Sequence, residues 1–316
     1  MSNAVLVVAF VILSVFSSAR AEAPAVAVDI APLHSLVTQV MGRRGTPELI
    51  VPTGASPHNH ALRPSEAQAL QAADIVFLIS DELTPSLADR IDTLAPDAVR
   101  MEMMAVPGTT VLPFRQSPLF EEQNSATHEE GHEEGHEEGH EEGHDHGELD
   151  PHAWLDPSNA VVWLDAIAVA LSKLDPQFAS TYSANADSGK NELMTLVTDV
   201  EEMLAPVRDR SFIVFHDAYQ YFEDAFRFHA SGAISLGDAS KPAPARIRKI
   251  HDLVDEAGIT CVLAEPQYNS DLVATVLDGT AARSSVVDPL GSHLQPGPDL
   301  YYELVRELGE TLTDCL

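Results

Sequence analysis

Six histidines recur at close spacing in the middle of the chain, in a pattern typical of metal capture. Residues 127–154 read THEEGHEEGHEEGHEEGHDHGELDPHAW, in which a His-Glu-Glu-Gly unit repeats. The repeat cannot build a core, because it has no apolar side chain and has glycine at every fourth position. Imidazoles among carboxylates indicate a solvated loop that binds metal ions. The histidines of this loop are His128, His132, His136, His140, His144 and His146.

Three other histidines lie where regular structure would hold them in place. His58 follows a short apolar stretch, and His216 directly follows the apolar run FIVF. His152 stands before helix-starting residues in the segment DPHAWLDP. A strand fixes the backbone of a ligand at its carboxyl end, and neighbouring carboxylates can orient the ring. Each histidine alone is more typical of an ordinary surface or core residue, but together they predict the main metal site.

Two further residues are candidates for the same site. Asp288 follows an apolar stretch within VVDPLG. It can complete a four-coordinate site, or it can simply cap the Asp-Pro-Leu-Gly turn. His60 is close enough to His58 to compete for the first ligand position.

The elements that must position these residues alternate between strands and helices. Buried strands that alternate with helices indicate an α/β fold with mostly parallel sheets, in which ligands bind at the carboxyl ends of the strands. The expected strands are residues 25–30, 48–51, 74–80, 211–215, 233–236, 259–264 and 285–287. The expected helices are residues 33–41, 64–73, 160–174, 218–228, 244–257 and 300–313.

A stretch without proline after residue 176 predicts one long helix that joins two lobes. At 1.5 Å per residue, roughly 28 residues would span about 42 Å. The predicted division is an N-terminal α/β lobe at 22–174 that contains a disordered loop at 121–148, the linking helix at 175–205, and a C-terminal α/β lobe at 206–316.

The charge of the chain favours cations as ligands. The 316 residues carry a formal net charge of −31, and residues 121–148 contribute twelve acids and no Lys or Arg. The rest of the chain is therefore also acidic. This balance argues against nucleic acid or an anionic membrane as a partner.

The N-terminus predicts export. Residues 5–16 form an apolar run shorter than the roughly 20 residues of a membrane span, and Ala19-Arg20-Ala21 fits the cleavage pattern of a signal peptide at 1–21. No Lys or Arg precedes the run, so a retained N-terminal anchor is the alternative. In an exported protein the isolated pair Cys261 and Cys315 is more typical of a disulfide than of two free thiols. Sequence alone does not show that the two cysteines can meet.

Four motifs together resemble a known family. GASPHNHALRPSEAQAL, DPHAWLDPSNA, FIVFHDAYQYFE and VVDPLG are similar to segments of the periplasmic zinc-binding proteins of zinc ABC transporters, in the cluster A-I of metal-binding solute receptors that also holds manganese receptors and adhesins. The resemblance covers essentially the whole mature chain. It implies two (β/α) lobes joined by a long rigid helix, with Zn²⁺ held in the cleft between them by His58, His152 and His216. It also implies a disulfide between Cys261 and Cys315.

The chain departs from this family's pattern at two positions. Pro57 stands where some members have a glutamate before the first ligand, which leaves Asp288 or a water as the fourth ligand. His60 stands where an aromatic residue is common, so it can relay metal from the loop to the site. Manganese-binding relatives have a glutamate where this chain has His216, and imidazole ligands favour zinc.

The resemblance predicts a function in the periplasm. We expect an extracytoplasmic solute-binding protein, not an enzyme, that captures Zn²⁺ and delivers it to the membrane permease of an ABC transporter. The histidine-rich loop would scavenge or sense zinc, unless it is a tolerated repeat expansion. A monomer is expected, with a periplasmic zinc chaperone as a second possible partner. The alternatives are a receptor for manganese or another divalent metal and, less favoured because no His-Glu-x-x-His motif occurs, a zinc-dependent hydrolase.

Overall fold

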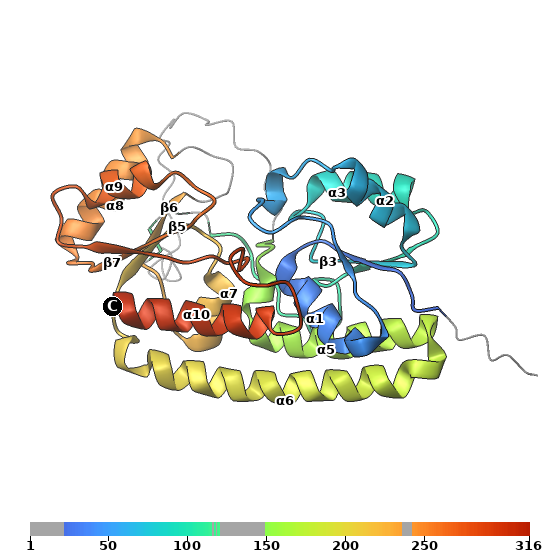
Figure 1. The fold of residues 1–316 in the computed structure, drawn as a ribbon. Helices are drawn as coiled ribbons and strands as arrows, with labels where there is room; N and C mark the ends of the chain where they lie inside the picture. The colour runs from blue at the N-terminus through green and yellow to red at the C-terminus, as the bar shows by residue number, and fades with distance from the viewer. Residues whose placement is uncertain (1–21, 116, 118, 121–148, 236–241) are drawn as a thin grey trace, which may run out of the picture.

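Two parallel sheets form two lobes that stand side by side on a layer of helices (Figure 1). The computed structural model describes residues 22–115, 117, 119–120, 149–235 and 242–316. The predicted signal peptide at 1–21 and the histidine-rich loop at 121–148 therefore lie outside the described residues. Among the residues that are described, no helix is both long and apolar enough to cross a membrane.

The first lobe is built on a four-stranded sheet. Its strands, in the order β2-β1-β3-β4, are β1 (Val26–Val28), β2 (Glu48–Leu49), β3 (Ile75–Leu78) and β4 (Val99–Glu102). The helices of this lobe are α1 (Ala31–Met41), α2 (Pro64–Ala72) and α3 (Pro85–Leu94). Every residue of β3 is buried, which agrees with its continuous apolar sequence.

The second lobe repeats the same plan. Its strands, in the order β6-β5-β7-β8, are β5 (Phe212–His216), β6 (Gly232–Ser235), β7 (Cys261–Ala264) and β8 (Arg283–Val286). The helices of this lobe are α7 (Gln220–Phe226), α8 (Pro244–Glu256) and α9 (Ser270–Leu277). All strand pairs in both sheets are parallel. The α/β fold with two lobes that the sequence predicted is confirmed.

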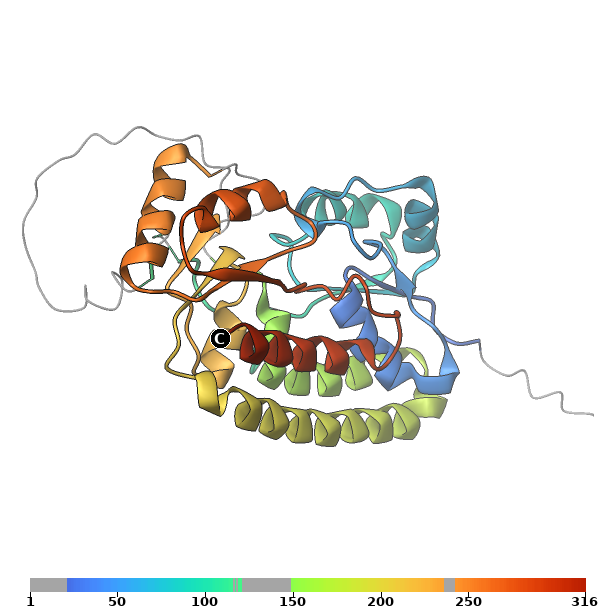
Figure 2. The same cartoon turned by 60° about the vertical axis from the view of Figure 1, so that its left-hand side comes forward.

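Three long helices form a layer beneath the sheets, and α6 extends beneath both lobes (Figure 1, Figure 2). They are α5 (Pro157–Leu174), α6 (Ala179–Leu204) and α10 (Leu300–Cys315). The linking helix α6 has 26 residues and begins after a 3-10 turn at Pro176–Phe178. Along its length α6 packs against α1, α5 and α10. A Cβ on Gly189 would lie 3.0 Å from the side chains of Leu164 and Tyr302, which explains a glycine within this helix.

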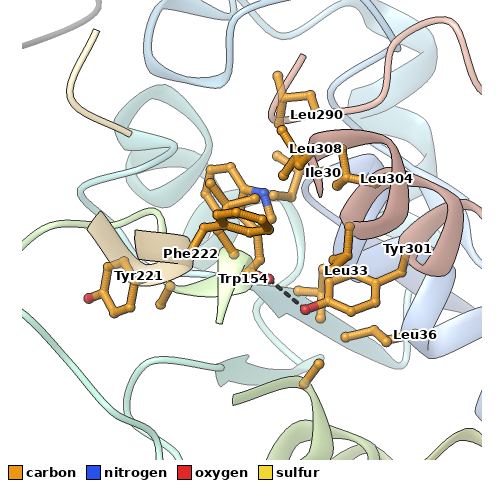
Figure 3. Close-up of a cluster of buried hydrophobic side chains, with 14 of the residues drawn as sticks. Ile30, Leu33, Leu36, Trp154, Tyr221, Phe222, Leu290, Tyr301, Leu304 and Leu308 are labelled. Carbon is orange, nitrogen blue, oxygen red and sulfur yellow. Dashed lines mark hydrogen bonds between the residues drawn. The ribbon is translucent and has the colours of Figure 1, made fainter. Parts of the chain in front are cut away.

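One continuous apolar core extends from the first lobe into the second. Ile30 and Leu33 contribute from the first lobe, Phe222 from the second, and Leu304 from α10 (Figure 3). Trp154 lies among them, and its carbonyl oxygen accepts a hydrogen bond of 2.7 Å from the Tyr301 hydroxyl. A shared core of this kind resists rotation of one lobe against the other, because close-packed interiors do not deform continuously.

Cys261 and Cys315 form a disulfide, as predicted. The bond joins β7 to the end of α10, with 5.6 Å between the two Cα atoms. It therefore ties the second sheet to the helical layer.

Candidate metal centre

The three predicted histidines meet at one cavity between the lobes. His58 lies in a 3-10 turn at Pro57–Asn59, after β2, and His152 directly precedes the turn at Ala153–Leu155. His216 is the last residue of β5, at the carboxyl edge of the second sheet. The ring centroids of His58 and His152 are 5.5 Å apart, and those of His152 and His216 are 5.2 Å apart.

Two imidazole nitrogens already have the spacing of zinc ligands. Nε2 of His152 lies 3.4 Å from Nε2 of His216. Zinc binds imidazole nitrogen at about 2.0–2.1 Å in tetrahedral geometry, which places two such nitrogens about 3.4 Å apart. Within the described part of the chain, no group of three or more His, Cys, Asp or Glu side chains is already arranged for coordination. His152 and His216 are therefore the two predicted ligands that the structure places at this spacing.

Buried carboxylates fix the orientation of both rings. Asp150 Oδ1 lies 2.6 Å from Nδ1 of His152, and Glu265 Oε1 lies 2.6 Å from Nδ1 of His216. Since a carboxylate only accepts hydrogen bonds, each Nδ1 donates to its carboxylate, and the contact between the two rings is made by the Nε2 atoms. The two carboxylate charges would balance a divalent ion.

The size of the cavity suits a single ion. Its volume is about 20 Å³, close to the space that one water molecule needs. Sites for organic ligands are usually in the range of about 300–1,000 Å³. The cavity is lined by Ser56, Pro57, His58, His152, Trp154, His216, Glu265, Gln267, Tyr268, Pro289 and Leu290.

Asp288 lies outside this cavity, with both of its carboxylate oxygens engaged elsewhere. Oδ1 accepts hydrogen bonds from Nε2 of Gln267 at 2.8 Å and from the backbone of Leu290 at 3.0 Å. Oδ2 accepts from the backbone N–H of Ser292 at 2.6 Å and from its hydroxyl. In the structure these bonds cap the Asp-Pro-Leu-Gly turn, and the role of Asp288 as fourth ligand stays a prediction.

His60 is not among the described residues that line the cavity. His60 Nε2 lies 2.8 Å from Glu66 Oε2, and Glu66 also accepts a hydrogen bond from the backbone of Arg63 at the start of α2. This contact holds His60 on the first lobe. His128, His132, His136, His140, His144 and His146 lie outside the described residues.

The described residues on either side of the histidine-rich loop are anchored at different places. Phe120 N donates to the carbonyl of Ser231 beside β6, and Leu149 forms a bridge with Pro113. Arg115 lies between these anchors and donates to Asp217 at 2.9 Å and to Glu223 at 2.9 Å. Burial raises the pKa of Asp217 to about 6, against the lowering influence of Arg115. Phe120 therefore lies at the amino edge of the second sheet, the edge opposite to His216, whereas Leu149 lies three residues before His152.

Four polar residues near the ligands were not predicted from the sequence. Asp150, only two residues before His152, was visible within the motif DPHAW. Glu265 follows β7 at the same sheet edge as His216, which is a signal that could have indicated it. Gln267 and Tyr268 come next in the chain and reach the cavity through their side chains.

Replacing Glu265 tests the support that it gives to His216. We expect Glu265→Gln to weaken zinc binding about 10- to 100-fold, because loss of the charge makes the imidazole less basic. Competition with a chelator measures the change in Kd. Glu307→Gln, on the outer face of α10, is the control and should bind like the wild type. A folded Glu265→Gln variant with unchanged zinc affinity would contradict the expected support.

Two parallel α/β lobes on a shared helical layer, with a histidine cavity between them, define a two-lobed solute receptor for a metal ion. Residues 26–315 match the sequence model of the ZnuA family, described as zinc-uptake complex component A, periplasmic. The chain belongs to this family.

Relatives are similar along almost the whole chain. A protein of Brucella abortus (strain 2308) named "High-affinity zinc uptake system protein ZnuA" is 44% identical over 318 residues, which cover 95% of this chain and 94% of the relative. The protein of the same name from Paracoccus denitrificans (strain Pd 1222) is 40% identical over 304 residues, with 94% and 93% covered.

Solved structures show the same fold. A crystal structure of ZnuA has a TM-score of 0.74 at 20% identity and covers 93% of this chain and 99% of that one. The solute-binding protein FpvC from Pseudomonas aeruginosa in complex with Mn²⁺ has a TM-score of 0.73 at 20% identity, with 93% and 98% covered. At these identities the likeness concerns the fold, which zinc and manganese binders share.

Proposed function

We propose that this protein captures Zn²⁺ outside the cytoplasm and delivers it to the membrane permease of an ABC transporter. The observation that carries the proposal is the pair of Nε2 atoms, 3.4 Å apart, of His152 and His216. Each ring is held by its own carboxylate. Membership of the ZnuA family and the names of the relatives from Brucella and Paracoccus support the same cargo.

The ligand types favour Zn²⁺ over Mn²⁺. Three imidazoles suit Zn²⁺, whereas Mn²⁺ prefers oxygen ligands. His58, His152 and His216 supply nitrogen only, and Asp288 is engaged in its turn. A cavity of about 20 Å³ also has no room for an ester or peptide beside the ion, which favours a receptor over a hydrolase.

Capture would proceed mainly by side-chain movement. His152 and His216 form the first contact with the ion, and the His58 ring then turns toward it from the opposite lobe. The core shared between the lobes limits any larger rearrangement. Trp154 lies with its ring centroid 5.3 Å from that of His152, so its fluorescence should report binding.

The test compares two metals on the metal-free protein. Calorimetric titration should show one tight zinc site, and Mn²⁺ should bind at least about 100-fold more weakly, as expected for nitrogen ligands. In vesicles that contain the permease and ATPase of the same organism, zinc uptake should require this protein. Equal affinity for Mn²⁺, or zinc uptake that does not depend on the protein, would contradict the proposal.

We also infer that the histidine-rich loop gathers zinc near the entrance of the site. The segment that follows the loop supports this role, because Leu149 lies three residues before His152 and Asp150 contacts the His152 ring. Flexible His and Glu residues should bind several ions more weakly than a preformed site. The same titration on a variant without residues 128–146 should lose these weak ions and keep the tight one. Unchanged stoichiometry would contradict a role of the loop in binding.

The periplasm is the expected location, with the signal peptide cleaved after Ala21. The apolar run at 5–16 and the Ala-x-Ala pattern support export. The disulfide agrees with an oxidising compartment. The receptor would act as a monomer, and a periplasmic zinc chaperone remains a second partner that the acidic loop can attract.

A further inference from the structure

Gln267 lies at the boundary between the metal cavity and the turn of Asp288. It follows β7 by three residues, and its side chain lines the cavity. Its Nε2 donates a hydrogen bond of 2.8 Å to Asp288 Oδ1. Because Asp288 acts only as an acceptor here, this bond fixes which way the amide points. The NH₂ group faces Asp288, and the carbonyl oxygen is directed away from it.

The carbonyl oxygen of this amide lacks a hydrogen-bond donor. Gln267 Oε1 is buried, and none of the residues that the structure describes donates to it. Buried acceptors without a partner are uncommon and costly, and each calls for an explanation. Gln267 lines the cavity of the three histidines and is not among the residues of the neighbouring hollow around Asp288. The missing donor is therefore to be sought in the metal cavity.

The donors that line the cavity do not reach this oxygen. Ser56, His58 and Tyr268 line the same cavity, but none of them donates to Gln267 Oε1. A zinc ion held by three protein ligands usually keeps a water in the fourth position. Such a water has two O–H groups, which the ion makes stronger donors. It is the donor whose chemistry fits Oε1.

We propose that Gln267 is a positioning residue for zinc: its carbonyl oxygen, oriented by Asp288, accepts a hydrogen bond from the water that completes the coordination of the ion. This inference rests on the proposed function. Asp150 and Glu265 already supply two negative charges, which balance Zn²⁺. A neutral amide adds an acceptor without adding charge. Asp288 would be a third carboxylate, but four hydrogen bonds hold it in its turn and away from the ion.

The central test replaces Gln267 by methionine, which has a similar shape and cannot accept this hydrogen bond strongly. Gln267→Met should bind zinc about tenfold more weakly, as expected for the loss of one hydrogen bond to a polarised group. The metal-free variant should unfold at a somewhat lower temperature, because methionine also loses the hydrogen bond from Nε2 to Asp288. Gln267→Glu loses the same donor but keeps an acceptor, so it should bind zinc more tightly than Gln267→Met. Gln295→Met, at an exposed glutamine, is the matched control.

Cobalt provides a readout that a purely structural role would not change. The visible absorption of the Co²⁺-loaded protein reports the ligands and geometry of the ion, so Gln267→Met should alter this spectrum and Gln295→Met should not. Wild-type zinc affinity with an unaltered cobalt spectrum in Gln267→Met would overturn the proposal. So would equal zinc affinities in Gln267→Met and Gln267→Glu, because both lose the donor to Asp288 and only the second keeps an acceptor. If the wild type and Gln295→Met both fail to bind zinc, the proposed function itself fails.

Discussion

The His216→Ala variant is expected to bind zinc in the cleft on the order of 100- to 1,000-fold more weakly than the wild type. Structural zinc sites with four ligands gain about 10–16 kcal/mol from the metal, so one ligand contributes roughly 3–4 kcal/mol. His216 supplies half of the preformed nitrogen pair. Its position at the end of β5 leaves no neighbouring imidazole on the same strand to replace it.

Competition with a zinc chelator measures this loss on the variant without residues 128–146, so that the loop does not obscure the tight site. His229→Ala is the matched control, because His229 is an exposed histidine of the same lobe with 63% of its side chain accessible. Circular dichroism verifies that both variants are folded. Zinc binding at wild-type strength in His216→Ala would show that the ion is held elsewhere.

The meeting of the three candidate histidines at one cavity could be predicted in part from the sequence, because strand ends are visible in it. The apolar run before His216 marks a central strand, and the order of strands and helices places its end at the edge of a parallel sheet. Which carboxylates hydrogen-bond to these histidines depends instead on side-chain distances between segments that are far apart in the sequence. Glu265 is 49 residues from His216, and nothing local indicates their hydrogen bond.

The strand β4 and the helices α3 and α9 could not be predicted from the sequence for a related reason. The strand β4 has the sequence VRME and no fully buried residue, because it lies at the edge of its sheet and pairs only with β3. Apolar runs reveal strands that are covered on both faces, so an edge strand of this kind gives no such signal. The helix α3 buries only Leu87 and Ile91, and α9 buries only Val273 and Val276. Two buried positions are too few to establish a helical period.

The role of Asp288 could not be decided from sequence for a geometric reason. A strand followed by Asp-Pro-Leu-Gly is compatible with a carboxylate that faces the cleft and with one that turns back on its own loop. The choice depends on Gln267 and Ser292, whose donors hold the carboxylate in the turn. The three histidines, by contrast, converge through the topology of the two sheets.

Replacing both Cys261 and Cys315 by alanine is expected to lower the free energy of unfolding by about 4 kcal/mol. The disulfide closes a loop between residues 54 positions apart, and the chain-entropy model gives a value of this size for such a loop. The bond fixes β7 to α10 and so holds the strand that precedes Glu265 against the helical layer. Zinc affinity should change less than about threefold, because no ligand depends directly on the bond.

Urea unfolding of the metal-free protein, with and without a reductant, measures this effect. The wild type should lose stability when it is reduced, and the double alanine variant should be insensitive to the reductant. A single replacement, Cys315→Ala, serves as the control for the free thiol that reduction leaves at Cys261. Because zinc binds only the folded protein, saturating zinc should recover part of the lost stability in proportion to the logarithm of its concentration. A double variant as stable as the oxidised wild type would show that the core shared by the two lobes suffices without the disulfide.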